Sequence, residues 1–442
     1  MELTTLTVSK LFGYFDHTIQ FNQDEKITII TAPNGYGKSV ILRMLNAIFS
    51  GDFHYIEKLI VKDISLEFSD KTELLFTKKS IEGEVEIKQI AKGKKVNSYA
   101  YSKKSAAAAE ILSGVPWLTR AGQGEWLDLR LGGLLTNRKA IEKYSRDDLF
   151  STDDQNIMSL PDWVQEYVEC INVRLIEDQR LIQRDKIHKK REDPFQRVDN
   201  TESVSPINTI EQYANELQRE IKNLTSEYSA IAQKLDSTFP NRLLSPLPNG
   251  KAAYTEDKLK KHLNKIENSR KRLVRYGLIE DESAEYTTEQ ISEENLKVLT
   301  LYVLDTQKKL KVYDNLVSQL DFFTSILNDK QLSHKQVRIS RNEGFYFETE
   351  NGISLNMVAL SSGEQHEVVL LYELIFKTDN NSLVLIDEPE ISLHIAWQEA
   401  FLEDLRKIQK IQPFTAIIST HSPQIIGEDW SLVVDLNGEE TG

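Results

Sequence analysis

Hydrophobic and polar positions along the chain predict β structure at both ends and helices in the middle. The run ITIITA at residues 27–32 is almost wholly apolar and ends at Pro33-Asn34-Gly35, and SVILRMLNAIF at 39–49 has helical spacing. The predicted order is strand, glycine-containing turn and helix. Between residues 61 and 90, apolar and polar residues alternate in short bursts such as ISLEF and EVEIKQI. These bursts predict an antiparallel β lobe.

The middle of the chain has a different period. Across 213–235, apolar residues recur every three or four positions, which predicts a helix with one apolar seam. A proline-rich break that begins at Pro240 precedes a second helical stretch near Glu256, and a further heptad pattern covers 296–327. The two longer helices would each span about 40 to 50 Å and form an antiparallel helical arm.

The β-like pattern returns from about residue 336, where VRIS and GFYFET are followed by the strands SLVLID and FTAIIST around a helix. We therefore expect the two ends of the chain to form one α/β head, interrupted by a helical, coiled-coil insertion. The predicted boundaries are 1–190 for the N-terminal half of the head, 191–335 for the insertion and 336–442 for the C-terminal half.

Composition excludes several classes of protein. A chain of 442 residues is too long for one core, so two or three structural units are expected. The single cysteine, Cys170, excludes a disulfide framework and a CxxC zinc or redox motif, and it favours a cytoplasmic location. No apolar run approaches the roughly 18 residues of a membrane span, and the N-terminus lacks the pattern of a secretory signal. The net charge of −14 argues against indiscriminate coating of nucleic acid but does not exclude a local basic patch.

The segment APNGYGKS at 32–39 matches a Walker A loop, with alanine in place of the usual first glycine. Such a turn points backbone N–H groups at phosphate, and the following helix adds its N-terminal dipole. Lys38 would reach the β- and γ-phosphates of ATP, and Ser39 would ligate Mg²⁺. The nucleotide-binding residues predicted in this loop are Asn34, Gly35, Gly37, Lys38 and Ser39.

The segment SLVLIDEPE at 382–390 predicts a buried strand that ends in two acids. Asp387 would bind Mg²⁺, and Glu388 would act as general base toward the attacking water. Two adjacent acids are also compatible with a solvated loop. The apolar run before them favours a site, because it places them at the carboxyl edge of a sheet, where ligands bind.

Two further motifs narrow the class. LSSGEQ at 360–365 resembles the LSGGQ signature of ABC ATPases. Alone, such a string is more often a helix N-cap, but here it precedes the predicted Walker B strand. Ser362 and the backbone of Gly363 would hold the γ-phosphate of ATP bound to a facing subunit. His421, which follows the strand FTAIIST, fits a switch histidine that contacts the γ-phosphate. The predicted signature residues are Ser361, Ser362, Gly363 and Glu364.

With these motifs in this order, the sequence resembles the ABC-class ATPases of the SMC, RecF and OLD type. The resemblance implies an ABC-type P-loop ATPase head, ATP and Mg²⁺ as cofactors, and catalytic roles for Glu388 and His421. It implies that Gln179 is the Q-loop glutamine that senses Mg²⁺ and the γ-phosphate, although an ordinary surface glutamine is a close alternative. The D-loop segment 391–394 is followed by Ile395 where the pattern has proline. Because each ATP would lie between two heads, a head-to-tail dimer or a larger homo-oligomer is expected.

The overall layout resembles the ATPase subunits of bacterial anti-phage systems. No CxxC marks the apex of the arm, and only about twenty residues follow FTAIIST, so neither a zinc hook nor a C-terminal TOPRIM nuclease is expected. The ATPase of the PARIS system, which works with a separate TOPRIM-like nuclease, is the nearest resemblance, and that of the Septu system is the neighbouring one. The implied function is an oligomeric scaffold that holds a nuclease effector and releases it when a phage protein is sensed. A DNA-clamping repair ATPase of the RecF type is the alternative, and no membrane partner is expected.

Two basic tracts bear on the choice between a defence scaffold and a DNA-clamping ATPase. Residues 180–192 hold six basic against two acidic residues, and residues 257–275 hold eight against two. Both are compatible with binding to DNA phosphates or to an acidic phage protein. A solvated helix face balanced by the acidic stretch 280–294 is favoured. The segments around Trp117 and Trp126 are either a partner surface or internal packing.

Overall fold

A computed structural model of the protein covers all 442 residues. The structure describes residues 1–78, 84–101, 160–177, 182–183, 207–245, 253–280, 292–329, 334–391 and 393–437, with residue 332 and short pieces between 112 and 144. The chain forms two compact units. The first contains Met1–Asn208 and Lys377–Gly442, and the second is Thr209–Phe376. The sequence predicts other boundaries for the insertion, at residues 190 and 335. These boundaries stay a prediction.

A five-stranded parallel sheet forms the centre of the first unit. Its order is β11-β17-β18-β3-β19, and every neighbouring pair is parallel. All five residues of β17 are buried, as expected for a sheet covered on both faces. The strands are β3 (Ile27–Thr31), β11 (Val173–Ile176), β17 (Leu383–Asp387), β18 (Thr415–Ser419) and β19 (Val433–Asp435). The helices of this unit are α1 (Lys38–Ser50), α2 (Phe53–Lys58), α6 (Asp162–Cys170), α12 (Ile395–Gln409) and α13 (Pro423–Ile426), with the 3₁₀ turn η5 (Trp430–Leu432).

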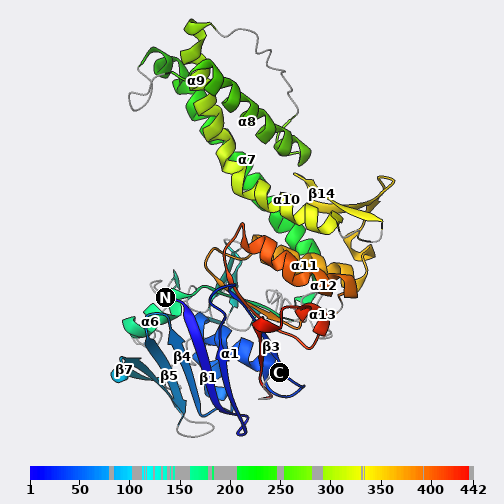
Figure 1. Ribbon diagram of the computed structural model, residues 1–442. Helices are drawn as coiled ribbons and strands as arrows, with labels where there is room; N and C mark the ends of the chain where they lie inside the picture. Colours follow the sequence, from blue (N-terminus) through cyan, green and yellow to red (C-terminus); the bar gives the residue numbers. More distant parts are fainter. Residues whose placement is uncertain are drawn as a thin grey trace, which may run out of the picture. The chain divides into compact units, whose positions relative to one another are not determined.

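An antiparallel sheet of six strands forms the β lobe of the same unit (Figure 1). Its order is β2-β1-β4-β5-β6-β7. In β4 the burial alternates residue by residue, because one face of the sheet meets the core. The strands are β1 (Leu3–Leu11), β2 (Phe15–Gln20), β4 (Asp63–Phe68), β5 (Thr72–Lys78), β6 (Val85–Ala91) and β7 (Lys94–Tyr101).

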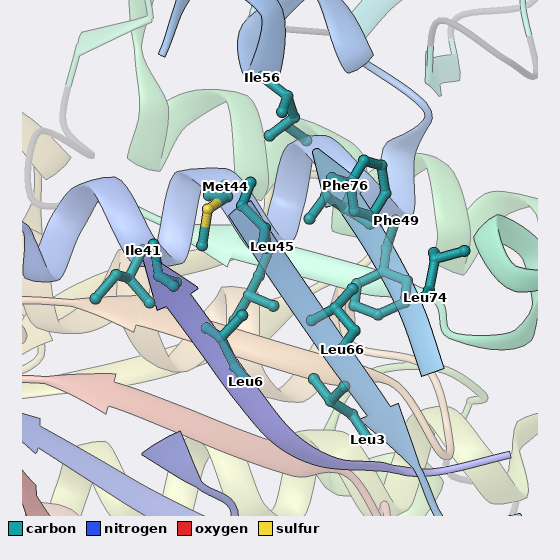
Figure 2. Packing of buried hydrophobic residues seen from close by; sticks show 14 of the residues in the cluster. Leu3, Leu6, Ile41, Met44, Leu45, Phe49, Ile56, Leu66, Leu74 and Phe76 are labelled. Carbon is teal, nitrogen blue, oxygen red and sulfur yellow. The ribbon is translucent and has the colours of Figure 1, made fainter. Parts of the chain in front are cut away.

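Helix α1 holds this β lobe and the parallel sheet together. Figure 2 shows its apolar residues beside those of the lobe, for example Met44 and Leu45 near Leu6. The same buried cluster includes Leu385 of β17 and Ile417 of β18. Because α1 is packed from more than one side, the turn that leads into it has little freedom to move.

Three short strands form a separate antiparallel sheet in the order β10-β9-β8, and β12 (Ile182–Gln183) pairs with β13 (Ile207–Asn208). The three strands are β8 (Leu118–Gly122), β9 (Glu125–Asp128) and β10 (Gly133–Thr136). Trp126 is buried in a local cluster with Leu118 and Tyr144. Internal packing, one of the two alternatives left open by the sequence, therefore accounts for Trp126.

The second unit contains three helical stretches that lie side by side (Figure 1). They are α7 (Thr209–Leu244), α8 (Glu256–Arg275), and α9 (Glu293–Leu310), which continues through η3 (Lys311–Tyr313) into α10 (Asp314–Asp329). Contacts from Tyr228 to Tyr313 and from Arg242 to Asp305 show that α7 is antiparallel to α9. Contacts from Tyr254 to Thr300 and from His262 to Gln307 show that α8 is parallel to α9. The predicted antiparallel arm is present, and α8 is the helical stretch that the sequence predicts near Glu256.

Two details of the helices differ from the prediction. The break that the sequence predicts from Pro240 begins later, since α7 continues through Pro240 to Leu244. The last turn is held by Arg242, whose two Nη atoms lie 2.5 and 2.7 Å from the carboxylate oxygens of Asp305. The 36 residues of α7 span about 54 Å, somewhat more than predicted. The heptad stretch 296–327 is interrupted by the single 3₁₀ turn η3.

A three-stranded antiparallel sheet and a buried helix complete the second unit. The elements are β14 (Lys335–Ser340), β15 (Gly344–Thr349), β16 (Ser354–Leu355), the 3₁₀ turn η4 (Met357–Ala359) and α11 (Ser362–Phe376). Gly344 has φ +74°, and a Cβ there would lie 1.9 Å from the carbonyl oxygen of Ala214 in α7. Only glycine allows this approach. An aromatic cluster around Phe323, Phe345 and Tyr372 fills the space between these elements.

The fold class predicted from the sequence is confirmed. The protein is an α/β protein with a parallel sheet, an antiparallel β lobe and a long helical insertion. The whole second unit lies in the connection from β11 to β17, which are hydrogen-bonded neighbours in the parallel sheet.

Candidate nucleotide-binding site

The turn between β3 and α1, which the sequence predicts to be a phosphate-binding loop, contains two glycines with positive φ. Gly35 and Gly37 have φ angles of +90° and +92°, and a Cβ at Gly37 would lie 2.6 Å from Cδ2 of Leu11. Glycine is therefore required at position 37 by backbone conformation and by space. Ala32, at the place of the usual first glycine, does not have a positive φ. Alanine therefore fits there without strain.

Lys38 lies at the first position of α1 with its side chain turned back over this loop. Its residue is only 5% exposed, and Nζ donates a hydrogen bond to the carbonyl oxygen of Ala32 at 3.0 Å. Nζ also contacts Nε2 of His421. Burial lowers the pKa of Lys38, although the acids Glu388, Asp387 and Glu390 act in the opposite direction. The charges of these acids favour the protonated form of Lys38, which is the form that can bind an anionic ligand.

Asp387 links the ends of β17 and β18 to the start of α1. Its Oδ1 accepts hydrogen bonds from Oγ of Ser39, at 3.0 Å, and from Oγ of Ser419. Asp387 is 2% exposed. A buried carboxylate beside a hydroxyl suits Mg²⁺, which binds proteins through one or two side-chain oxygens and completes its shell with water and phosphate oxygens. Among the described residues, no group of three or more His, Cys, Asp or Glu side chains is arranged to hold a metal ion.

Glu388 has a backbone conformation that side chains rarely adopt. Its φ is +43°, and its N–H donates to the carbonyl oxygen of Ser419 at 2.9 Å. Oε1 lies 3.9 Å from Nε2 of His421. Burial, followed by the charges of Asp387 and Glu390, raises the pKa of Glu388. A raised pKa makes a carboxylate a stronger base, and local backbone strain of this kind gathers at functional sites.

The structure adds Glu390 to the candidate site. The sequence motifs did not predict it, although it lies in the same DEPE segment as Asp387 and Glu388. Its Oε1 accepts a hydrogen bond from the backbone N–H of His421 at 2.6 Å. Gln398 of α12 donates to the carbonyl oxygen of Leu393 at 3.0 Å and accepts from Oγ of Ser422 at 2.7 Å. The loops after β17 and β18 are therefore joined on both sides of His421. A third acid within two residues of Glu388 was the available signal in the sequence.

Replacing Glu390 with alanine is expected to lower the kcat of ATP hydrolysis about tenfold and to leave KM nearly unchanged, because His421 loses the acceptor that orients its backbone. Glu390→Gln keeps an oxygen at that place and should recover part of the loss. Steady-state phosphate release over a range of ATP concentrations measures both constants. Glu399→Ala, on the exposed side of α12, is the matched control. An unchanged kcat in Glu390→Ala contradicts the positioning role.

Residues on the other side of the phosphate-binding loop fix its outer turn. Nε2 of His17 lies 3.1 Å from the carbonyl oxygen of Tyr36, and burial lowers the pKa of this imidazole. The rings of Phe15 and Tyr36 have centroids 4.8 Å apart. These contacts attach the loop to β2 and were not anticipated, because the residues lie about twenty positions apart in the sequence.

The predicted signature residues lie in the second unit, at the start of α11. Ser361 and Glu364 form a capping box: the N–H of Ser361 donates to Oε2 of Glu364 at 2.7 Å, and the N–H of Glu364 donates to Oγ of Ser361 at 3.3 Å. Nζ of Lys335 lies 2.7 and 2.9 Å from the two carboxylate oxygens of Glu364. Burial raises the pKa of Glu364, but the hydrogen bonds from Lys335 and Ser361 hold it below its usual value.

This capping arrangement leaves the first turn of α11 open. Ser362 is exposed and Gly363 partly exposed, and the first backbone N–H groups of a helix have no carbonyl partner within the helix. The start of α11 can therefore accept an anion from outside. The roles of Ser361, Ser362, Gly363 and Glu364 toward a nucleotide stay predictions.

Two other predicted features lie at the edge of the described residues. Gln179 lies outside them, but Glu177, two positions earlier, has Oε1 3.1 Å from Nε of Arg43 in α1. In the D-loop segment, Nδ1 of His394 accepts from the N–H of Ala396 at 3.4 Å and caps α12. Ile395 is the first residue of that helix. This position also favours proline, so the exchange for isoleucine keeps the helix start.

The family model of the AAA ATPase domain matches residues 1–426, and the chain belongs to this family. It is therefore an ATPase, and membership of this P-loop family implies ATP binding. No helix in the described part of the chain is both long enough and apolar enough to cross a lipid bilayer.

Curated relatives match only parts of the chain. Protein ea59 of Escherichia phage lambda is 29% identical over 126 residues, which are 28% of this chain and 24% of that protein. The retron Ec83 probable ATPase of Escherichia coli is 32% identical over 87 residues, which are 17% of this chain and 16% of that protein. The matched part thus spans about a quarter and about a sixth of the lengths of these relatives.

Among solved structures, this chain is similar to the Smc head domain of Pyrococcus furiosus with an extended coiled coil, bound to the C-terminal domain of ScpA. The alignment covers 98% of this chain and 93% of the Smc chain. The TM-score is 0.37 and the identity 12%. The SMC head domain from Thermotoga maritima aligns over 96% of this chain and 91% of its own, with a TM-score of 0.32 and 12% identity.

Proposed function

We propose that the edge of the parallel sheet binds ATP together with Mg²⁺ and hydrolyses it. The observation that carries this proposal is the convergence of Lys38, Asp387 and His421 from the ends of β3, β17 and β18. Direct contacts join Lys38 to His421 and Ser39 to Asp387. These groups come from three strands that are neighbours in one sheet, and the carboxyl edge of such a sheet is the usual place for a ligand.

Each side chain has a distinct part in the proposed reaction. Mg²⁺, when bound, would supply positive charge that offsets the negative charge of the phosphates. Ser39 and Asp387 would hold that ion, and Lys38 would neutralise phosphate charge once its contacts with Ala32 and His421 are exchanged for phosphate oxygens. Glu388 would accept a proton from the attacking water, for which its raised pKa suits it. His421 would contact the γ-phosphate.

The second half of the proposed site is the start of α11 in another copy of the chain. Ser361, Ser362 and Gly363 lie at the exposed end of a long helix, and the capping box leaves its first N–H groups available. A single copy is then expected to hydrolyse ATP poorly. Assembly of heads around ATP, followed by hydrolysis, would shift the protein between discrete states.

The biological role that we propose is a sensor and scaffold in anti-phage defence, with a separate nuclease, TOPRIM-like or of another class, as effector and a phage protein as trigger. The layout of an ATPase interrupted by a helical arm supports it, as does the local similarity to the retron Ec83 probable ATPase. Binding of an effector to one assembled state and its release from another would be enough to control it.

Light scattering of the purified protein with and without ATP, alone and co-expressed with the product of the adjacent reading frame, tests this role. The expected result is an ATP-dependent rise in mass to a dimer or larger, and a stable complex with a nuclease-like partner. A mass that stays monomeric with ATP contradicts the composite site. An assembled ATPase that forms no complex contradicts the scaffold role alone.

A further inference from the structure

Helix α8 of the second unit presents a continuous basic stripe to solvent. Between Glu256 and Arg275 the helix has eight Lys or Arg residues and three acidic ones. Its exposed positions are Asp257, Lys258, Lys261, Asn264, Lys265, Asn268, Lys271, Arg272 and Arg275. Successive positions are one or three residues apart and the pattern repeats every seven residues, so they lie along one side of the helix. We call Lys258, Lys261, Lys265, Lys271, Arg272 and Arg275 the α8 stripe.

The opposite side of α8 fixes the orientation of this stripe. Leu259, Leu263, Ile266 and Leu273 are at most 4% exposed. Gln307 of α9 lies 3.0 Å from Nδ1 of His262, and α8 packs along α9. Because the buried seam is packed against a neighbouring helix, the stripe points outward and cannot turn inward without exposing that seam.

Four of the six residues of the α8 stripe form no ion pair with a residue that the structure describes. Two acids of α8 pair with a lysine one turn further along the helix. Lys260 pairs with Glu256 at 2.7 Å, and Lys271 pairs with Glu267 at 2.9 Å. Arg272 pairs with Asp321 of α10. Lys258, Lys261 and Lys265 form no ion pair with any residue that the structure describes, and all three are exposed. Three like charges thus follow one another along two turns, and Asp257 is the exposed acid on the same face.

The chemistry of the stripe favours a nucleic acid over an acidic protein. All residues of α8 are described, and its exposed side chains are only basic residues, two asparagines and one aspartate. Protein partners are usually held by aromatic or aliphatic anchors, and this face offers none. Interfaces with nucleic acid are polar and strongly positive, and lysine, arginine and asparagine all donate to phosphate oxygens.

The length of the stripe fits the backbone of a duplex. From Lys258 to Arg275 it covers about 26 Å along the helix axis, a distance over which a DNA duplex carries about fifteen negative charges. From this face, its unpaired lysines and its length, we infer that α8 binds the phosphate backbone of duplex nucleic acid without reading its sequence. None of the residues of the α8 stripe belongs to the residues proposed to bind ATP, so this binding does not depend on ATP hydrolysis.

The test uses the full chain and a fluorescently labelled duplex of about 20 base pairs, as DNA and as RNA, with binding followed by anisotropy at several salt concentrations. The variant Lys258→Gln/Lys261→Gln/Lys265→Gln removes three phosphate contacts. Between about 50 and about 200 mM salt, three phosphate contacts account for a change in affinity of about 40-fold. Over this range, the affinity of wild type should therefore fall by a factor about 40 times larger than the affinity of the variant does. Two duplexes of unrelated sequence should bind alike.

A matched control separates the stripe from general charge. Lys222→Gln/Lys234→Gln/Lys308→Gln changes the charge equally at exposed positions on α7 and α9, and it should keep the wild-type salt dependence. All three proteins should hydrolyse ATP equally in the absence of nucleic acid, which distinguishes loss of the stripe from loss of the ATPase. The inference is overturned if wild type binds neither duplex, or if stripe and control variants lose affinity equally. Binding of polyglutamate in place of either duplex also overturns it and assigns the stripe to an acidic protein.

Discussion

Replacing Lys38 with alanine is expected to abolish nucleotide binding, with a loss in ATP affinity of at least about 100-fold, or about 2.7 kcal/mol. The ammonium group of Lys38 contacts both the carbonyl oxygen of Ala32 in the predicted phosphate-binding loop and His421. A charge-assisted hydrogen bond to phosphate in a site screened from water is among the stronger polar contacts. Isothermal titration calorimetry with ATP and Mg²⁺ measures the change directly.

The stability of the Lys38→Ala protein separates lost binding from lost folding. A melting temperature of Lys38→Ala close to that of wild type would show that the variant is folded, so that its loss of ATP affinity is a loss of binding. Lys62→Ala, at an exposed lysine of the same unit, is the control for loss of one positive charge. ATP affinity like that of wild type in Lys38→Ala contradicts the assignment of the loop.

Replacing Glu388 with glutamine is expected to leave ATP binding intact and to slow hydrolysis by about 10² to 10⁴-fold. Glutamine keeps the size of the side chain and an oxygen near His421, but it cannot accept the proton of water. The ATP-bound assembly should therefore accumulate. Phosphate release measures the first effect, and light scattering with ATP measures the second, as a larger mass that persists after wild type has returned to smaller species.

Two outcomes of this experiment discriminate between roles for Glu388. Hydrolysis at the wild-type rate contradicts its assignment as general base. Slow hydrolysis without a persistent assembly leaves the base assignment intact and contradicts the composite site between two copies. Glu399→Gln, which changes an exposed acid on α12, should behave as wild type in both measurements.

The parts of the site that could be predicted are those encoded in short, contiguous stretches. ITIITA and the following loop determine a strand, a turn with Gly37 at positive φ and a helix by local rules alone. The apolar run before Asp387 likewise gives a buried strand and places the acid at its end. These features need no knowledge of distant neighbours, which is why periodicity and turn residues were sufficient.

The parts that could not be predicted depend on contacts between distant segments. Glu390 acquires its role only because β18 pairs beside β17 and brings the N–H of His421 within reach. His17 meets the loop through the pairing of β1 with β2. The parallel course of α8 and α9 is set by which seams pack together, and heptad spacing does not define direction.

The position of the second unit in the chain has an evolutionary consequence. A parallel pair of strands always needs a crossover connection, and between β11 and β17 this crossover has become the whole of Thr209–Phe376. A crossover can grow or be exchanged without altering the hydrogen bonds of the sheet that it joins. Since α11 and the stripe-bearing α8 lie in the same crossover, one recombination event would transfer them together. The helical arm and the predicted signature would then change together, while the parallel sheet keeps its hydrogen bonds.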